Sequence, residues 1–196
     1  MDVILSRARA DAQECDLLVS GIFQDERPLQ GTTGWIDWRL NGRLSRLVMS
    51  KKVTGDWKET TLIPSNRRII PKMILLLGLG RTKEYSYLRL REIVPHLLET
   101  LKNLHPSSLC LSLPDGEERY NVDCGKLTEI FLEGVADGLD RWEHTADEEW
   151  IKALRLFFGE GENRASEILL GVQAAQSSLR NRLVLRVLVP SHEGKG

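Results

Sequence analysis

The feature that most constrains the fold is an apolar run, Met73–Leu79, which is interrupted only by Gly78 and followed by Gly80. The run is too short to span a membrane, which takes about 20 apolar residues. It is also too uniformly apolar for a strand with one face in water. It predicts a central strand of a sheet covered on both faces and ending at a glycine turn. In open α/β sheets, ligands bind at that carboxyl edge of the strands.

Short apolar runs alternate with helical patterns along the rest of the chain. Strands are predicted over 3–7, 16–23, 60–63, 69–77, 108–113, 150–158 and 183–189, and helices over 36–48, 87–104, 123–144 and 163–179. This alternation predicts an α/β fold with three layers, α/β/α, around a mixed, mostly parallel sheet that has helices on both faces. We expect one domain over residues 1–180 and an extra strand or extended tail over 181–196.

The composition narrows the classes of partner. The 27 basic residues nearly balance the 28 acidic ones, which argues against a nucleic-acid or anionic-membrane partner for the whole domain. The three cysteines, Cys15, Cys110 and Cys124, are widely spaced and form no CxxC pair, so we expect reduced structural thiols. No signal peptide or membrane helix is predicted, and we expect a cytoplasmic protein.

Several short segments follow one another in a characteristic order: Asp16–Asp25, Pro28–Gly31, Ile36–Asp37, Leu44–Ser45, a turn at Gly55, Met73–Gly80 and Glu133–Gly138. Together they resemble the N-terminal domain of the cytosolic leucyl aminopeptidase family. The resemblance implies a macro-domain-like α/β/α fold that holds no metal ligands and contributes to assembly of a hexamer. In that family the chemistry belongs to a separate C-terminal domain, where carboxylates and a lysine hold two metal ions.

The metal-binding segments of that catalytic domain are absent from this sequence, which has no Asn-Thr-Asp-Ala-Glu-Gly-Arg stretch. We therefore expect no enzyme activity, no metal and no cofactor. The expected function is a non-catalytic domain that acts in oligomer assembly or protein interaction. Its partner would be a further copy of itself or a separate peptidase subunit. The alternative is a macro-type module that binds a nucleotide or an ADP-ribose-like ligand.

Glycines near the predicted strand ends are the candidate ligand-binding residues. Backbone N–H groups of Gly78 and Gly80 could hold a phosphate, with Arg81 adding positive charge. The stretch from Gly31 to Gly34 is a second candidate, as a glycine-containing loop. The competing interpretation of Gly78–Arg81 is a tight turn that leaves a buried strand.

Tryptophan and arginine side chains mark a second candidate surface. Trp35 and Trp38 fall on one face of a predicted helix, where an exposed pair would suit an interface and a buried pair would cap the core. Basic residues recur on and beyond this helix: Arg39, Arg43, Arg46, Lys51, Lys52, Arg67 and Arg68. They predict either a local anion-binding patch or an ordinary solvated face.

Overall fold

The computed structural model describes residues 1–142, 146–179 and 182–188, and its centre is a seven-stranded sheet. The strands are β1 (Asp2–Ile4), β2 (Leu17–Ile22), β3 (Thr60–Pro64), β4 (Met73–Gly78), β5 (Ser108–Ser112), β6 (Arg155–Phe158) and β7 (Arg186–Leu188). Their order is β3-β4-β2-β5-β6-β1-β7. Neighbouring strands run parallel except β3 and β4, which are antiparallel.

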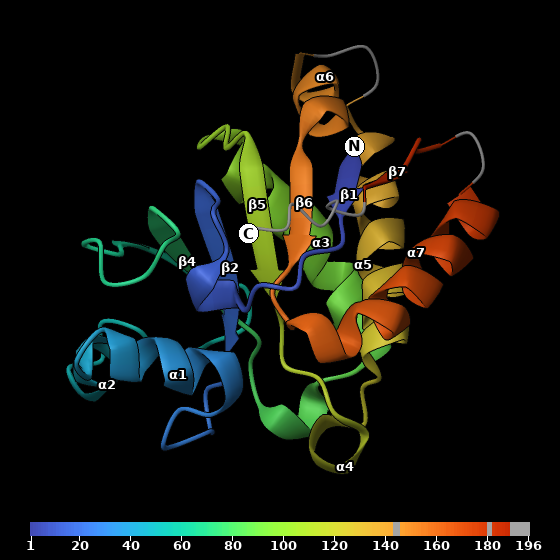
Figure 1. Cartoon of the computed structure of the whole chain (residues 1–196). Helices are drawn as coiled ribbons and strands as arrows, with labels where there is room; N and C mark the ends of the chain where they lie inside the picture. The colour runs from blue at the N-terminus through green and yellow to red at the C-terminus, as the bar shows by residue number, and fades with distance from the viewer. Residues whose placement is uncertain (143–145, 180–181, 189–196) are drawn as a thin grey trace, which may run out of the picture.

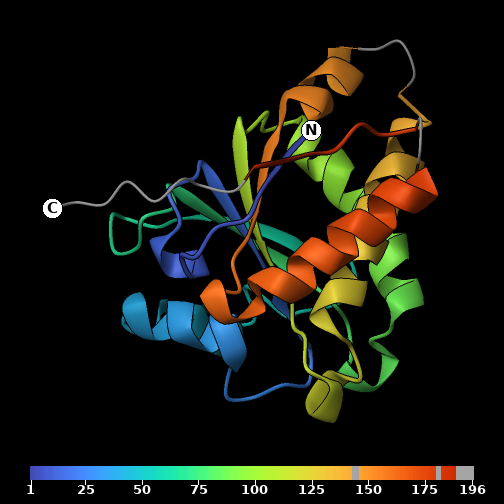
Figure 2. The ribbon, with the colours of Figure 1, turned by 45° about the vertical axis from the view of Figure 1, so that its right-hand side comes forward.

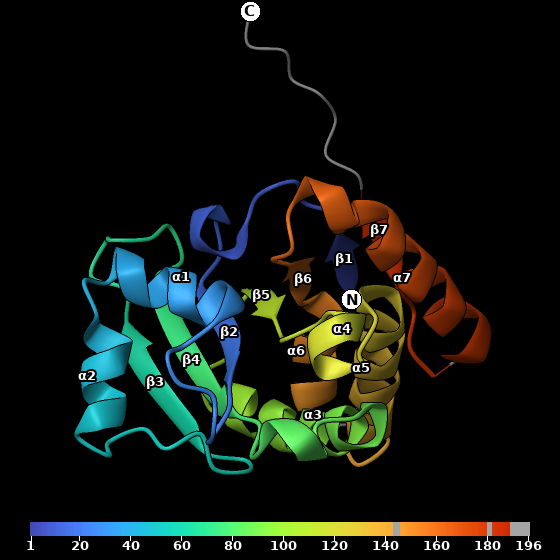
Figure 3. The same ribbon diagram turned by 90° about the horizontal axis from the view of Figure 1, so that it is seen from below.

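Helices cover both faces of this sheet (Figure 1). They are α1 (Gly31–Arg39), α2 (Arg43–Met49), α3 (Tyr87–Lys102), α4 (Glu117–Tyr120), α5 (Cys124–Leu139), α6 (Ala146–Ala153) and α7 (Ala165–Leu179). In the view from below, α1 and α2 lie on one side of the sheet, and α3 and α5 lie on the other (Figure 3). The predicted three-layer fold with a mostly parallel sheet is confirmed.

The central strands divide their side chains between two cores because successive residues of a strand point to opposite faces. Leu75 and Leu77 of β4 pack in the core beneath α3, α5 and α7. Ile74 and Leu76 of the same strand pack in the smaller core beneath α1 and α2. All four side chains are almost fully buried, as an apolar run without alternation predicts for a strand covered on both faces.

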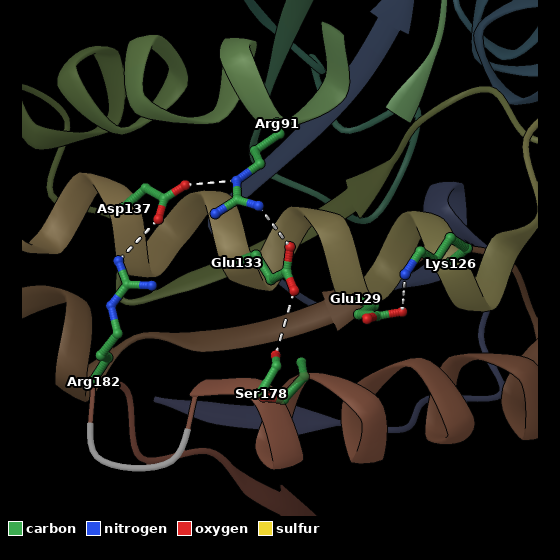
Figure 4. Close-up of polar contacts among 8 residues, drawn as sticks. Arg91, Lys126, Glu129, Glu133, Asp137, Ser178 and Arg182 are labelled. Atoms are coloured by element: carbon green, nitrogen blue, oxygen red, sulfur yellow. Dashed lines mark hydrogen bonds and ion pairs between the residues drawn. The ribbon is translucent and has the colours of Figure 1, made fainter. Parts of the chain in front are cut away.

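The three long helices on one face are joined to one another. Gly125 and Gly171 allow α5 and α7 to approach closely, because a Cβ at Gly171 would stand 2.1 Å from the Gly125 oxygen. Figure 2 shows α7 lying across α5. Arg91 of α3 donates to Asp137 and Glu133 of α5 at 2.7 and 3.1 Å. Figure 4 shows this arginine reaching across to the two carboxylates.

Two predicted elements differ from the structure in the first half of the chain. The helix predicted over 36–48 is two helices, because Gly42 adopts a left-handed conformation between them (φ 72°) and Asp37 accepts hydrogen bonds from the first N–H groups of α2. The strand predicted over 69–77 begins at Met73. Asn66 and Arg67 have positive φ angles of 54° and 60°, so the chain turns before it enters β4.

Two further differences lie in the second half. The strand predicted over 150–158 is wrong in its first part, since residues 146–153 form α6 and only Arg155–Phe158 form β6. The helix predicted over 123–144 ends at Leu139, and residues 143–145 lie outside the described residues. The predicted last strand is present as β7, paired with β1, while 189–196 lie outside the described part of the chain.

Candidate functional site

A small cavity of about 130 Å³ lies at the carboxyl ends of β2 and β5, the edge at which the fold predicts a ligand. Carboxylates surround it, contributed by Glu26, Asp115 and Glu160. Two arginines that lie close by are engaged with these acids: Arg119 pairs with Glu26 at 2.9 Å, and Arg164 pairs with Asp115. The cavity is therefore acidic, and its neighbouring cations are committed to internal ion pairs.

The carboxyl group of Glu160 has a strongly shifted pKa in this cavity. Burial raises the pKa of its carboxyl group to about 7, and the neighbouring Asp115 carboxylate adds to the rise. Ser112 Oγ donates to Glu160 Oε1 at 3.0 Å, which opposes the rise because it favours the ionised form. Burial also raises the pKa of Asp115. The described lining of the cavity holds no lysine or arginine, so no side chain in it would balance the negative charge of a phosphate.

The structure does not gather the predicted glycine site. Gly31 lines the cavity, but Gly34, Gly78, Gly80 and Arg81 do not belong to its lining. Residues 31–34 are the first turn of α1, so the expectation of a glycine loop there is wrong. The helix starts here because Thr33 donates to the Gly21 oxygen at 2.6 Å, which fixes the first turn to β2.

Gly34 and Gly78 both sit against neighbouring backbone. A Cβ at Gly34 would stand 2.4 Å from the Leu29 oxygen, and one at Gly78 would stand 1.9 Å from the Asp56 oxygen. Gly80 has a φ of 74°, and its N–H donates to the Gly55 oxygen at 3.0 Å. Arg81 is exposed and precedes a short 3₁₀ helix, Thr82–Glu84. Gly78 and Gly80 therefore join the turn after β4 to the loop over residues 53–59.

The predicted tryptophan pair forms a defined structure on α1. The two indole rings stack with centroids 5.0 Å apart and an interplanar angle of 29°. Trp38 is 64% exposed, whereas Trp35 is half-buried, so the structure places neither indole within the two main cores. Aromatic side chains with this exposure are typical of protein-interaction surfaces.

Three residues hold the indole pair in place. Asp11, which is buried, accepts from Trp35 Nε1 at 3.0 Å and from Arg39 Nε at 3.2 Å. The guanidinium of Arg9 lies 4.5 Å from the centre of the Trp35 ring, and that of Arg39 lies 5.4 Å from the Trp38 ring. Each arginine is within the range of a cation–π contact. The indole pair is therefore held by polar and cation–π contacts from two segments.

No pattern in the sequence marks Arg9 and Asp11 as part of this surface. They lie at a short 3₁₀ helix, Ala10–Ala12, and 24 residues separate Asp11 from its partner Trp35. Among the described residues, no group of three or more His, Cys, Asp or Glu could hold a metal ion. The three cysteines are free and buried, and no helix within the described ranges is long and apolar enough to cross a membrane.

Known proteins resemble this chain in sequence. The family model described as the N-terminal domain of the cytosol aminopeptidase family matches residues 19–145. A probable cytosol aminopeptidase of Alkaliphilus metalliredigens is 22% identical over 179 residues, which cover 89% of this chain and 35% of the relative. One of Geobacter sp. is 31% identical over 97 residues, covering 50% of this chain and 19% of the relative. The chain thus spans about a third or less of the length of these relatives.

Solved structures resemble it in fold. A mutant form of the Oceanobacillus iheyensis macrodomain aligns with a TM-score of 0.62 at 12% identity, over 90% of this chain and 92% of that one. A macrodomain of Trypanosoma brucei in complex with ADP aligns with a TM-score of 0.59 at 15% identity, over 87% and 67%. At these identities the likeness shows the macrodomain-like fold alone. Taken with the match over residues 19–145, the chain belongs to the cytosol aminopeptidase family and carries its N-terminal domain.

Proposed function

We propose that this chain is a non-catalytic assembly domain, which joins protein subunits through the surface around Trp35 and Trp38. The observation that carries the proposal is the exposed indole of Trp38, stacked on Trp35 and flanked by Arg39. A large apolar ring kept in water is unfavourable by itself, and a partner that covers it recovers this hydrophobic free energy. Because the ring is already held in place, covering it costs little conformational entropy.

The family supports the non-catalytic part of the proposal. The chain carries the N-terminal domain and about a third of the length of its aminopeptidase relatives. A cytoplasmic location belongs to the same proposal and is supported by the description of the relatives as cytosol aminopeptidases.

Nucleotide binding is the weaker alternative, although one structural neighbour was solved with ADP. A diphosphate at the strand ends would lie beside Glu26, Asp115 and Glu160. Arg119 and Arg164, the cations close to it, already pair with two of these carboxylates. The cavity of about 130 Å³ is also smaller than the roughly 300 Å³ at which ligand pockets usually begin.

Trp38→Ala is expected to weaken self-association of the chain by roughly 30-fold, which corresponds to the loss of about 2 kcal/mol at an interface hot spot. The physical reason is that the exposed indole supplies apolar area that an alanine cannot. Sedimentation velocity between about 1 and 100 µM protein measures the change as a shift from oligomer toward monomer.

Leu88→Ala is the matched control, because Leu88 is also a large exposed apolar residue (68%) but lies on α3. It should leave the association unchanged. Both variants should keep the melting temperature of the wild type, since each replaces an exposed side chain. A wild-type chain that stays monomeric throughout, or equal losses in the two variants, would contradict the proposal.

A further inference from the structure

We infer that residues 115–122 form a lid over the cavity at the carboxyl ends of β2 and β5, and that this lid opens while the rest of the fold stays in place. The lid comprises α4 and the residues on either side of it. The structure holds the lid closed, through contacts with Glu26. The inference goes beyond the proposed assembly and does not depend on it.

The lid forms one wall of the cavity. In the structure, α4 lies beyond the carboxyl ends of the central strands (Figures 1 and 3). Asp115 and Tyr120 of the lid line the cavity together with Ser112, the last residue of β5. The Tyr120 ring stacks on Phe23, which follows β2, with centroids 5.4 Å apart and an interplanar angle of 28°. Displacing the lid therefore opens the cavity to solvent.

The body of the fold anchors the chain on both sides of the lid. Before the lid, the Pro114 oxygen accepts from Tyr85 Oη at 2.8 Å. After it, Asp123 N–H donates to Tyr87 Oη at 2.9 Å, and the Asp123 side chain caps α5 by accepting from Lys126 N–H. Tyr85 is buried, and Tyr87 begins α3. Movement of the lid therefore leaves the ends of β5 and α5 in place.

Two residues with left-handed backbone flank α4. Gly116 has a φ of 117° and Asn121 has a φ of 54°. The two flanks meet, because Gly116 N–H donates to the Val122 oxygen at 2.7 Å. A Cβ at Gly116 would meet no atom from elsewhere in the chain within 4 Å, so the glycine is needed for its backbone angle and not for packing. Hinges are usually a few such residues that absorb the change in φ and ψ, and we expect α4 to turn about these two.

One carboxylate holds the lid against the loop that follows β2. Glu26 Oε1 accepts from Tyr120 Oη at 2.7 Å and pairs with Arg119 Nη2 at 2.9 Å. Burial raises the pKa of Tyr120, and the contact with Glu26 adds to the rise, so the phenol keeps its proton and remains the donor. Hydrogen bonds to a charged group are among the stronger ones in proteins. Removing the Glu26 carboxylate therefore breaks two contacts of the lid at once.

The lid has few other contacts that would keep it closed. The ion pair between Asp115 and Arg164 lies next to the hinge at Gly116, where an opening motion displaces the chain least. The described side chains of α4 are exposed at Glu118 and Arg119 and half-buried at Tyr120. A short segment with so little buried surface opens at a smaller cost in free energy than the whole fold.

Thiol labelling of the full chain with iodoacetamide tests the inference, with Ser112→Cys as the reporter. Ser112 is buried and lines the cavity, so a thiol there reacts when the lid opens. Cys15 and Cys110 are buried in the core and report opening of the whole fold. Mass spectrometry with peptide fragmentation gives the rate at each cysteine. Adding Glu26→Ala should accelerate labelling at position 112 at least tenfold, which corresponds to about 1.4 kcal/mol, and leave the two core cysteines unchanged.

Glu118→Ala is the matched control, because it removes an exposed carboxylate from the lid itself without removing the contacts of Glu26. It should leave the labelling rate at position 112 unchanged. Tyr120→Phe keeps the stacked ring and removes one of the two contacts, so its rate should lie between those of the reporter protein and Glu26→Ala. The inference is wrong if Glu26→Ala gives no acceleration, if Glu118→Ala gives as much, or if the core cysteines accelerate by the same factor.

Hydrogen exchange without the reporter substitution gives a second measurement. The amide hydrogens of Gly116 and Tyr120 are bonded within the lid, to the Val122 and Gly116 oxygens at 2.7 and 2.9 Å. They should exchange at least tenfold faster in Glu26→Ala than in the wild type, while those of β5 and α5 keep their rates. Equal acceleration in the lid, β5 and α5 would show global destabilisation and contradict the inference. Assembly through Trp38 can hold whichever result is obtained.

Discussion

Gly78→Ala is expected to lower the free energy of unfolding by about 2 to 3 kcal/mol, the cost of overpacking at a site that cannot relax freely. A Cβ there would stand 1.9 Å from the Asp56 oxygen, which is far inside van der Waals contact. The loop cannot move away cheaply, because Gly78 N–H donates to the Glu59 oxygen at 2.7 Å and the Gly78 oxygen accepts from Lys58 N–H at 3.0 Å. Urea unfolding followed by circular dichroism measures the change.

Arg81→Ala is the control for this prediction, since Arg81 is exposed and three residues away. It should change the free energy of unfolding by less than about 0.5 kcal/mol. If the turn bound a ligand instead, Arg81→Ala would weaken binding of that ligand. A fully stable Gly78→Ala variant would show that the close approach to Asp56 is not part of the fold in solution.

Glu160→Gln is expected to abolish a pH dependence of the free energy of unfolding that amounts to about 2 to 3 kcal/mol. The size of the effect follows from the pKa shift, since a pKa that differs by one unit between the folded and unfolded states corresponds to about 1.36 kcal/mol. The pKa of Glu160 is raised to about 7 in the fold from an ordinary value of 4.5. The neutral form is therefore favoured in the folded state. The stabilisation that this neutral carboxyl group contributes is complete below pH 4.5 and is lost as the pH rises through 7. Because glutamine does not ionise, the variant lacks this part of the loss of stability over that interval.

The measurement is chemical unfolding of both proteins at several pH values from about 4.5 to 8. The difference in free energy of unfolding, variant minus wild type, should grow by about 2 to 3 kcal/mol as the pH rises. Asp16, whose pKa is lowered by its hydrogen bond from Lys72, titrates below this interval. Glu118→Gln, at an exposed carboxylate on α4, should follow the wild type. A difference that does not depend on pH would mean that the Glu160 carboxylate is solvated.

The sequence predicts the central strands well because β2, β4 and β5 are short, mostly apolar runs, as strands covered on both faces are. It fails where tertiary contacts determine the local structure. The break between α1 and α2 depends on Gly42 and on the Asp37 side chain, which accepts hydrogen bonds from the backbone seven and eight residues later. Similarly, the helical pattern of α6 is followed after one residue by β6, so the two read as a single apolar segment.

The candidate site could be predicted only in part for the same reason. Trp35 and Trp38 stand one helical turn apart, so their stacking follows from local geometry. The residues that hold them, Arg9 and Asp11, come from a distant segment, and no local pattern marks them. At Gly34 and Gly78 the missing side chain makes room for neighbouring backbone, and the glycine pattern alone does not distinguish this role from ligand binding.

The most direct test of the central claim is an NMR dilution series that follows the indole N–H signals of the five tryptophans in ¹⁵N-labelled protein. If the chain assembles through α1, the signals of Trp35 and Trp38 shift or broaden as the protein is concentrated from about 10 to 500 µM. Those of Trp57, Trp142 and Trp150, which lie on other elements, keep their positions. Unchanged Trp35 and Trp38 signals, in a sample that shows association by another method, would contradict the claim.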